Sequence, residues 1–216
     1  MAVQSYAQCG EDLQIAYLLG RGDGLTYIDV GCLWPIEHSN TYFFYERGGS
    51  GLCIDPNPDV AVDFTHQRPR DLFLQAALGR QPGTATYRMH ENPVFNTFSD
   101  ERAERVRGQA ASRSGRGLVA TRELPLITLD EAIRTTAFAD RCEGHLDFLT
   151  VDVEGLEQEV LGGFSFAPLR PRLVVCEHLR RRRDEPVADS GIASILKQHG
   201  YWLAAYTGHD VYFLDG

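Results

Sequence analysis

The sequence predicts an α/β fold in which a mainly parallel sheet carries helices on both faces. Short apolar runs rich in β-branched and aromatic residues alternate with segments of helical periodicity, the pattern of strand–helix–strand units. The first strand breaks at Gly31 into a loop and a helix, and the second strand ends in an acid, Asp55. A hairpin over residues 201–214 closes the chain and adds an antiparallel strand, as mixed sheets permit.

The first half of the chain supplies three strands and three helices. Strands are expected at residues 25–30, 51–55 and 72–78, and the alternating residues 84–89 form an extra strand. Helices are expected at residues 11–19, 40–47 and 58–67, with Ser39 as a cap for the second of them.

Residues 91–117 interrupt this alternation. The segment is polar, rich in Arg, Ser and Gly, and has little apolar periodicity except for a helical stretch around 100–107. We interpret it as a mobile excursion from the sheet that acts as a substrate lid.

The second half returns to regular elements. Ordered structure is expected to return over residues 118–127, Thr128 opens a capping box for a helix that reaches about residue 138, and residues 145–152 are expected to be a strand. A helix around residues 156–161, a strand at 172–177 and a helix that starts at Asp189 follow before the terminal hairpin.

Length and composition place the chain among soluble single-domain proteins. At 216 residues, residues 1–216 are expected to form one domain with a full core. A net charge of −9 argues against general binding to nucleic acids or membrane surfaces. The five cysteines are widely spaced without a C-x-x-C pair, which is typical of reduced thiols in a cytoplasmic protein. The oligomeric state does not follow from the sequence.

Candidate site residues gather where the predicted strands end. Ligands of open α/β sheets lie beyond the carboxyl ends of the strands. A glycine turn at Gly31 and the helix start near Ser39 suit an adenosine-type cofactor, and Asp55 is placed to accept hydrogen bonds from ribose hydroxyls. The other strand ends carry Ala76–Ala77, Asp152 and Glu177–His178.

Several of these stretches together resemble the FkbM family of S-adenosylmethionine-dependent methyltransferases. The matching stretches are Ser5–Asp12, Asp29–Gly31, Ser39–Thr41, Gly51–Pro56, Thr128–Asp130 and Asp147–Gly155. The resemblance implies the class I methyltransferase fold, a Rossmann-like sheet of seven strands with the last antiparallel. It also implies S-adenosyl-L-methionine as the cofactor and methylation of hydroxyl groups, often on sugars or natural products. One departure is Leu33-Trp34-Pro35, where a common form of the family carries a second glycine.

The strand ends and the resemblance together assign residues to the cofactor. These are Gln8, Asp29, Gly31, Ser39, Asp55, Pro56, Ala76, Ala77 and Asp152.

Two chemistries are open for the acceptor side. His178 is a candidate general base, because an unperturbed histidine titrates near neutral pH, and Asp152 is its catalytic companion. Alternatively, Asp152, Glu177 and His178 hold a magnesium ion, although a histidine is an unusual Mg²⁺ ligand. His38, on the loop after the first strand, is a second possible base.

The acceptor is expected to be a small molecule of the sugar or natural-product class, and the arginines suggest an anionic one. Two groups of arginines, at residues 102–116 and 180–183, stand near the expected entrance and would suit phosphate or carboxylate groups. N-methylation of a small amine and a non-catalytic cofactor-binding domain are the alternatives. A nicotinamide-dependent oxidoreductase is disfavoured because the full G-x-G-x-x-G fingerprint is absent after the first strand.

Overall fold

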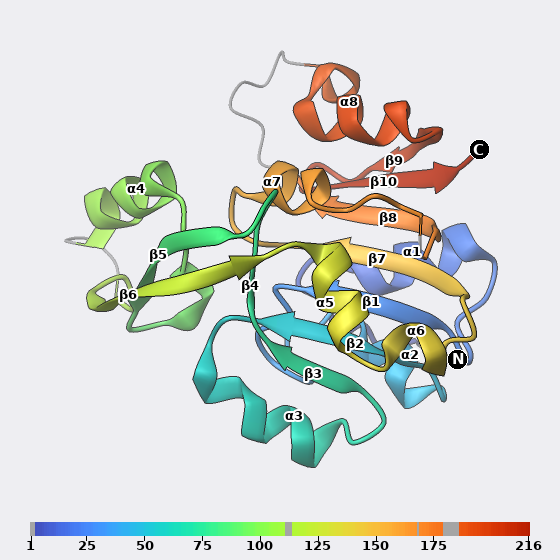
Figure 1. Ribbon diagram of the computed structural model, residues 1–216, viewed down its shortest axis with the longest axis horizontal. Helices are drawn as coiled ribbons and strands as arrows, with labels where there is room; N and C mark the ends of the chain where they lie inside the picture. The colour runs from blue at the N-terminus through green and yellow to red at the C-terminus, as the bar shows by residue number, and fades with distance from the viewer. Residues whose placement is uncertain (1–2, 111–113, 168, 179–185) are drawn as a thin grey trace.

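A central sheet of seven strands runs through the computed structural model, which describes residues 3–110, 114–167, 169–178 and 186–216 (Figure 1). The strand order is β3-β2-β1-β7-β8-β10-β9. Five strands are parallel, and β10 pairs antiparallel with both β8 and β9. The strands are β1 Thr26–Val30, β2 Ser50–Asp55, β3 Leu72–Gln75, β7 Leu146–Val151, β8 Pro171–Glu177, β9 Tyr201–Tyr206 and β10 Asp210–Asp215.

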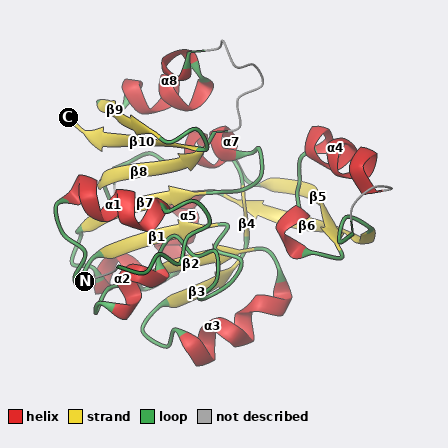
Figure 2. Ribbon diagram, turned by 180° about the vertical axis from the view of Figure 1, so that it is seen from behind, coloured by secondary structure: helices red, strands yellow, loops and turns green. Residues whose placement is uncertain are grey.

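Helices cover both faces of this sheet, as the alternating sequence predicted (Figures 1 and 2). One face carries α1 (Glu11–Leu19), α2 (Tyr42–Glu46) and α3 (Ala61–Gln67), and the other carries α5 (Leu129–Thr135), α6 (Phe138–Arg141), α7 (Glu157–Gly162) and α8 (Gly191–Gln198). Successive strand residues point to opposite faces of the sheet. Tyr27 therefore packs in the core under α1, α2 and α3, and Ile28 packs in the core under α5 to α8.

A second, three-stranded sheet projects from the carboxyl edge of the first. It has the order β4-β6-β5, with β4 Ala77–Leu78, β5 Gly83–His90 and β6 Leu118–Ile127. Between β5 and β6 lies the excursion, which contains α4 (Asp100–Ala110). Figure 1 shows this hairpin and α4 standing away from the main sheet.

Four predicted element boundaries were wrong. The expected strand 72–78 divides at Ala76, because β4 leaves the main sheet to pair with β6. The helix expected from residue 40 begins at Tyr42, with the Ser39 hydroxyl accepting from the Tyr42 N–H at 3.1 Å. The helix expected over 128–138 is divided into α5 and α6. The last helix is capped by Ser190, not opened by Asp189.

A buried arginine organises the first face of the sheet. The Arg68 side chain is fully buried and forms an ion pair with Asp71 at 2.6 Å. Its guanidinium also donates to the Tyr27 hydroxyl at 3.0 Å and the Thr41 hydroxyl at 2.9 Å. Thr41 in turn donates to Asp29 at 2.5 Å. This network therefore holds β1, the start of α2 and the segment after α3 together.

Within the described ranges, no helix is long and apolar enough to cross a membrane.

Candidate functional site

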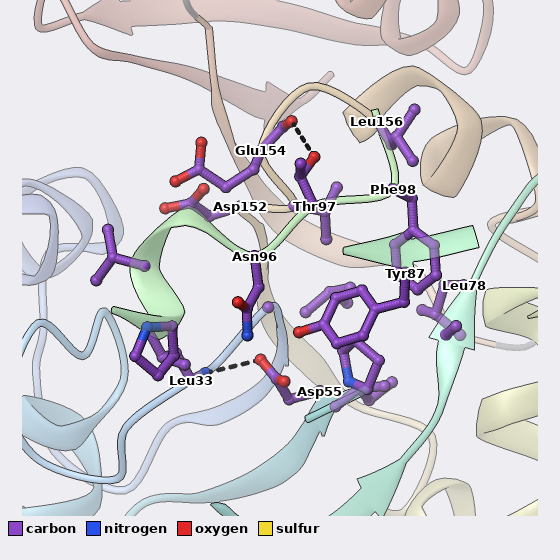
Figure 3. Close-up of a pocket in the computed structure, with 18 of the residues that line it drawn as sticks. Leu33, Asp55, Leu78, Tyr87, Asn96, Thr97, Phe98, Asp152, Glu154 and Leu156 are labelled. Atoms are coloured by element: carbon purple, nitrogen blue, oxygen red, sulfur yellow. Dashed lines mark hydrogen bonds between the residues drawn. The ribbon is translucent and has the colours of Figure 1, made fainter. Parts of the chain in front are cut away.

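A cavity of about 320 Å³ opens between the carboxyl ends of β1, β2 and β7 and the projecting hairpin (Figure 3). Polar groups converge at one end, where Asp55, Tyr87 and Asn96 face one another, while apolar side chains line much of the rest. The lining residues predicted from the sequence are Gln8, Gly31, Asp55, Pro56, Ala76, Ala77 and Asp152.

Asp55 is the buried acid of this cavity. Its carboxylate accepts the backbone N–H of Leu33 at 3.1 Å and that of Asn57 at 2.8 Å, which fixes its orientation. Burial raises the pKa of Asp55 to about 6 despite these hydrogen bonds. Each carboxylate oxygen can accept more than one hydrogen bond, so Asp55 retains acceptor capacity toward the cavity.

Two other residues assigned to the cofactor lie elsewhere. Asp29 and Ser39 do not line the cavity and belong to the buried network around Arg68. Burial raises the pKa of Asp29 to about 6, and the Thr41 hydroxyl opposes this shift. We therefore attribute their place in the motifs to the anchoring of β1 and α2.

Gly31 is required by the packing of the two central strands. Its φ of 84° favours glycine, and a Cβ atom there would lie 1.8 Å from the carbonyl oxygen of Asp152. The sequence associates this glycine with the cofactor turn, and Gly31 does line the cavity; the structure adds a close approach of backbone to backbone.

The Leu33–Trp34 departure forms part of the cavity wall at the loop after β1. Leu33 has a φ of 41°, a conformation in which a glycine is more comfortable, which gives a physical reason for a glycine in other forms of this loop. Leu33, Trp34 and His38 all line the cavity, and the Trp34 and His38 rings lie 5.5 Å apart.

A second, more polar cavity of about 560 Å³ lies on the other side of the loop after β7. Glu177 and His178 line it, as do α4 and the start of α8. Glu154 and Leu156 line both cavities, so the loop between β7 and α7 forms their shared wall.

Carboxyl groups crowd around that shared wall. One oxygen each of Asp152, Glu157 and Glu177 lies within 4.8 Å of the others, a spacing that could hold a cation. His178 is not part of this group. The candidate metal ligands therefore differ from the predicted set in having Glu157 in place of His178. Burial, and then the charge of Glu177, raises the pKa of Asp152. Burial raises the pKa values of Glu154 and Glu177 to about 8.

Sequence reasoning missed much of the cavity wall that comes from the excursion. Its contributors are Asn92, Pro93, Val94, Asn96, Thr97 and Phe98. The first residues of the excursion therefore line the cavity, and the role of the segment as a lid stays a prediction. An Asn-Pro pair at residues 92–93 signalled a turn, but no pattern indicated that the turn would face the strand ends.

Three arginines of the excursion have acidic partners, whereas the Arg116 guanidinium lies over the Phe95 ring at 4.2 Å. Arg102 forms an ion pair with Glu154, Arg105 pairs with Glu101, and Arg107 pairs with Glu104. Residues 113 and 180–183 lie outside the described part of the chain. The prediction of an anionic acceptor therefore gains nothing from the first three arginines.

Fold and cavity together define the class. A seven-stranded sheet of this order, with its last strands antiparallel and a cavity at the carboxyl ends of β1 and β2, is the class I methyltransferase fold. Residues 20–203 match the methyltransferase FkbM domain. The chain belongs to this family, as the sequence motifs indicated, and the family implies S-adenosyl-L-methionine as the cofactor.

The solved structures found to be similar to this chain are distant in sequence. A precorrin-6y C5,15-methyltransferase from Geobacter metallireducens is 10% identical, with a TM-score of 0.47 over 100% of this chain and 94% of that one. A candidate rRNA methylase from Clostridium thermocellum is 9% identical, with a TM-score of 0.49 over 100% of both chains. No curated protein matches the chain.

The donor set of the first cavity fits that cofactor. A carboxylate at the end of β2 suits the ribose hydroxyls, and the apolar side chains of Ile54, Leu78 and Phe98 line the same cavity.

Proposed function

We propose that the protein transfers the methyl group of S-adenosylmethionine to a hydroxyl group of a small molecule, in the class of sugars or natural products. The observation that carries the proposal is the pair of cavities that meet at one loop. The first has the ribose-binding acid of a cofactor site, and the second has polar and titratable side chains suited to an acceptor.

The chain's own residues would act mainly by positioning the two reactants. When bound, the cofactor supplies an electrophilic methyl group. Asp55 accepts hydrogen bonds from the cofactor's ribose in the first cavity, and residues 152–156 separate the two cavities. His178 accepts the proton of the acceptor hydroxyl, while Asp152 orients a reactant at the shared wall.

A magnesium ion is the alternative to His178 as a general base. Asp152, Glu157 and Glu177 would supply the oxygen ligands that Mg²⁺ prefers, and the ion would lower the pKa of the acceptor hydroxyl. We favour the metal-free form, because His178 stands beside Glu177 in the second cavity, where a magnesium site would more naturally place an oxygen ligand.

A small amine is the second candidate acceptor, and the charge of the second cavity favours it. Glu154, Glu157 and Glu177 line this cavity, while Arg102 is paired with Glu154. Burial raises the pKa values of Glu154 and Glu177 to about 8, and a cationic ammonium group beside them would favour their ionised forms. Incubation with labelled cofactor and matched sets of sugars and amines decides between the two classes by the product that carries the label.

Cofactor preference is the direct test of the first cavity. Calorimetric titration should show binding of S-adenosylmethionine or its demethylated product and weaker binding of NAD. Asp55→Ala should weaken the binding free energy of the preferred ligand by about 1.5–3 kcal/mol, the usual loss for hydrogen bonds to a charged group. Tighter binding of NAD, or an unchanged affinity in Asp55→Ala, would contradict the assignment.

Cofactor affinity should also fall at acidic pH. Because burial raises the pKa of Asp55 to about 6, its carboxylate becomes protonated as the pH drops through that value and accepts hydrogen bonds less well. The dissociation constant should therefore be flat above this range and rise below it. In Asp55→Asn the affinity should be weaker and nearly independent of pH over the same interval, and an unchanged pH profile would mean that another group titrates.

The excursion is expected to become protected when ligands bind. Arg105 and Arg107 are exposed on α4 and offer trypsin sites within the segment. Cleavage there should be ready in the free protein and slower with the cofactor product and an acceptor present. Cleavage after the exposed Arg134 of α5 serves as the internal control. Equal rates at α4 with and without ligands would make the segment a passive loop.

A further inference from the structure

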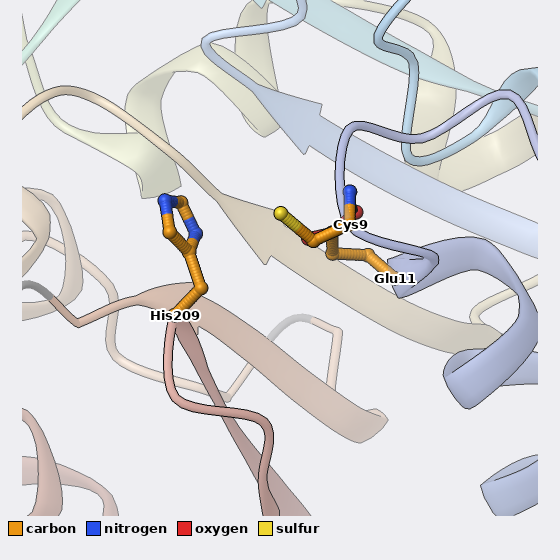
Figure 4. Close-up of side chains that lie close together, drawn as sticks. All are labelled: Cys9, Glu11 and His209. Carbon is orange, nitrogen blue, oxygen red and sulfur yellow. Dashed lines mark hydrogen bonds between the residues drawn. The ribbon is translucent and has the colours of Figure 1, made fainter.

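A cysteine, a glutamate and a histidine from the two ends of the chain meet beside the cofactor cavity. Cys9 precedes α1, Glu11 is its first residue, and His209 lies in the turn between β9 and β10. One ligand atom from each lies within 4.8 Å of the others. Figure 4 shows the Cys9 sulfur and the His209 ring turned toward one another, with Glu11 behind the cysteine.

From this juxtaposition we propose a binding site for a divalent transition metal of the zinc class. Thiolate, imidazole and carboxylate are the ligands of protein zinc sites, and three of them leave a fourth position for water. Magnesium and calcium prefer oxygen ligands alone, so the sulfur and nitrogen donors select against them.

The histidine already has the surroundings of a metal ligand. Its Nδ1 atom lies 3.2 Å from a carboxylate oxygen of Asp210, and its Nε2 atom lies 3.5 Å from a carboxylate oxygen of Glu177. Whichever nitrogen binds a metal, the other faces a carboxylate that can accept its N–H. Carboxylate–histidine–metal arrangements of this kind fix the ring and raise its basicity.

The glutamate is also held in place. The Glu11 side chain is buried, and one of its oxygens accepts the backbone N–H of Cys9 at 2.8 Å. It lies against Asp210, so two buried carboxyl groups face each other at this point. A divalent cation would offset their mutual repulsion.

An unsatisfied hydroxyl provides an independent observation. Tyr212 on β10 is 0% exposed, and its hydroxyl has no hydrogen-bond partner among the described residues. The neighbouring Thr207 hydroxyl does not meet it in hydrogen-bonding geometry. The Tyr212 hydroxyl lies within electrostatic reach of Asp210, Glu11 and Cys9. An unpaired buried hydroxyl is costly, and a water bound to the metal would supply its partner.

Metal binding would join the N-terminal segment to the terminal hairpin. Gln8, which lines the cofactor cavity, is adjacent to Cys9. The metal would therefore hold Gln8 against the cavity and act as a positioning element for the site.

Titration of the metal-free full-length protein with Co²⁺ tests the proposal without any need for an acceptor. A near-ultraviolet thiolate-to-cobalt absorption band should grow to one equivalent and disappear on addition of Zn²⁺. Cys9→Ser should abolish that band, and His209→Ala should weaken cobalt binding. Asp210→Asn, which removes a partner of the histidine, should weaken binding by about 10–100-fold.

Matched controls separate this site from general thiol chemistry. Cys142→Ala and His66→Ala change the same residue types elsewhere in the chain and should leave the band and the affinity unchanged. Circular dichroism establishes that each variant is folded. The absence of a thiolate band in the wild-type protein, or its persistence in folded Cys9→Ser, would overturn the proposal.

Discussion

Replacing His178 with alanine is expected to lower kcat by about 10²–10⁴-fold for an acceptor that the wild-type protein methylates, the usual contribution of a general base. The His178 side chain lines the second cavity, as Glu177 does. A histidine accepts a proton only in its neutral form, so the rate of the chemical step should rise with pH in the wild type. This rise should be absent from the variant, whereas cofactor affinity should not change.

Two comparisons make this result specific to His178. The exposed His66 on α3 provides a control, and His66→Ala should retain full activity. Glu177→Gln tests the competing base, because burial raises the pKa of Glu177 to about 8 and its ionised form could also accept a proton. A larger loss in Glu177→Gln than in His178→Ala would transfer the role to the carboxylate.

Chelation separates the base from the magnesium alternative. If His178 acts without a metal at the shared wall, activity should not depend on magnesium. EDTA should then cause no loss of activity that added magnesium alone restores. Loss restored by magnesium, with Asp152→Asn and Glu177→Gln behaving alike, would favour the ion. Cys9→Ser, assayed in parallel, accounts for any effect of chelation at the Cys9 site.

Asp71→Asn is expected to destabilise the protein by about 3–5 kcal/mol, because it leaves the charge of Arg68 buried without its counter-ion. Both side chains of the pair are at most 1% exposed. Asp71 also accepts the Gly51 N–H at 2.8 Å and the Tyr27 hydroxyl at 3.0 Å. Urea unfolding monitored by circular dichroism measures the change.

Asp63→Asn on the surface of α3 is the matched control and should change the unfolding free energy by less than about 0.5 kcal/mol. Replacing Arg68 and Asp71 together with apolar residues should recover part of the loss, since the guanidinium is then no longer buried without Asp71. A loss in Asp71→Asn no larger than in Asp63→Asn would mean that water reaches Arg68.

The sequence identified the main sheet and the strand ends that surround the cofactor cavity. Apolar runs such as residues 145–152 are long enough to predict buried strands, and Asp55 follows from its place at the end of one of them. The family resemblance also pointed to residues 5–12, whose composition alone indicates only the polar start of a helix.

Long-range contacts explain what the sequence could not show. Asp29 occupies a strand end, yet its partner is Thr41, which is held by an arginine further along the chain. A single buried arginine leaves no trace in hydrophobic periodicity, so this network was not predictable. From the sequence, Ala77 continues the strand that starts at Leu72. In the structure it pairs with Leu126 and belongs to the second sheet.

The wall shared by the two cavities has a consequence for how ligands influence one another. Glu154 faces both cavities and holds Arg102 of α4, so a ligand that moves this side chain in one cavity changes the shape and charge of the other. Cofactor and acceptor are then linked thermodynamically, and each must alter the affinity of the other by the same factor. Because the shared wall is the loop between β7 and α7, this linkage requires no movement of the main sheet.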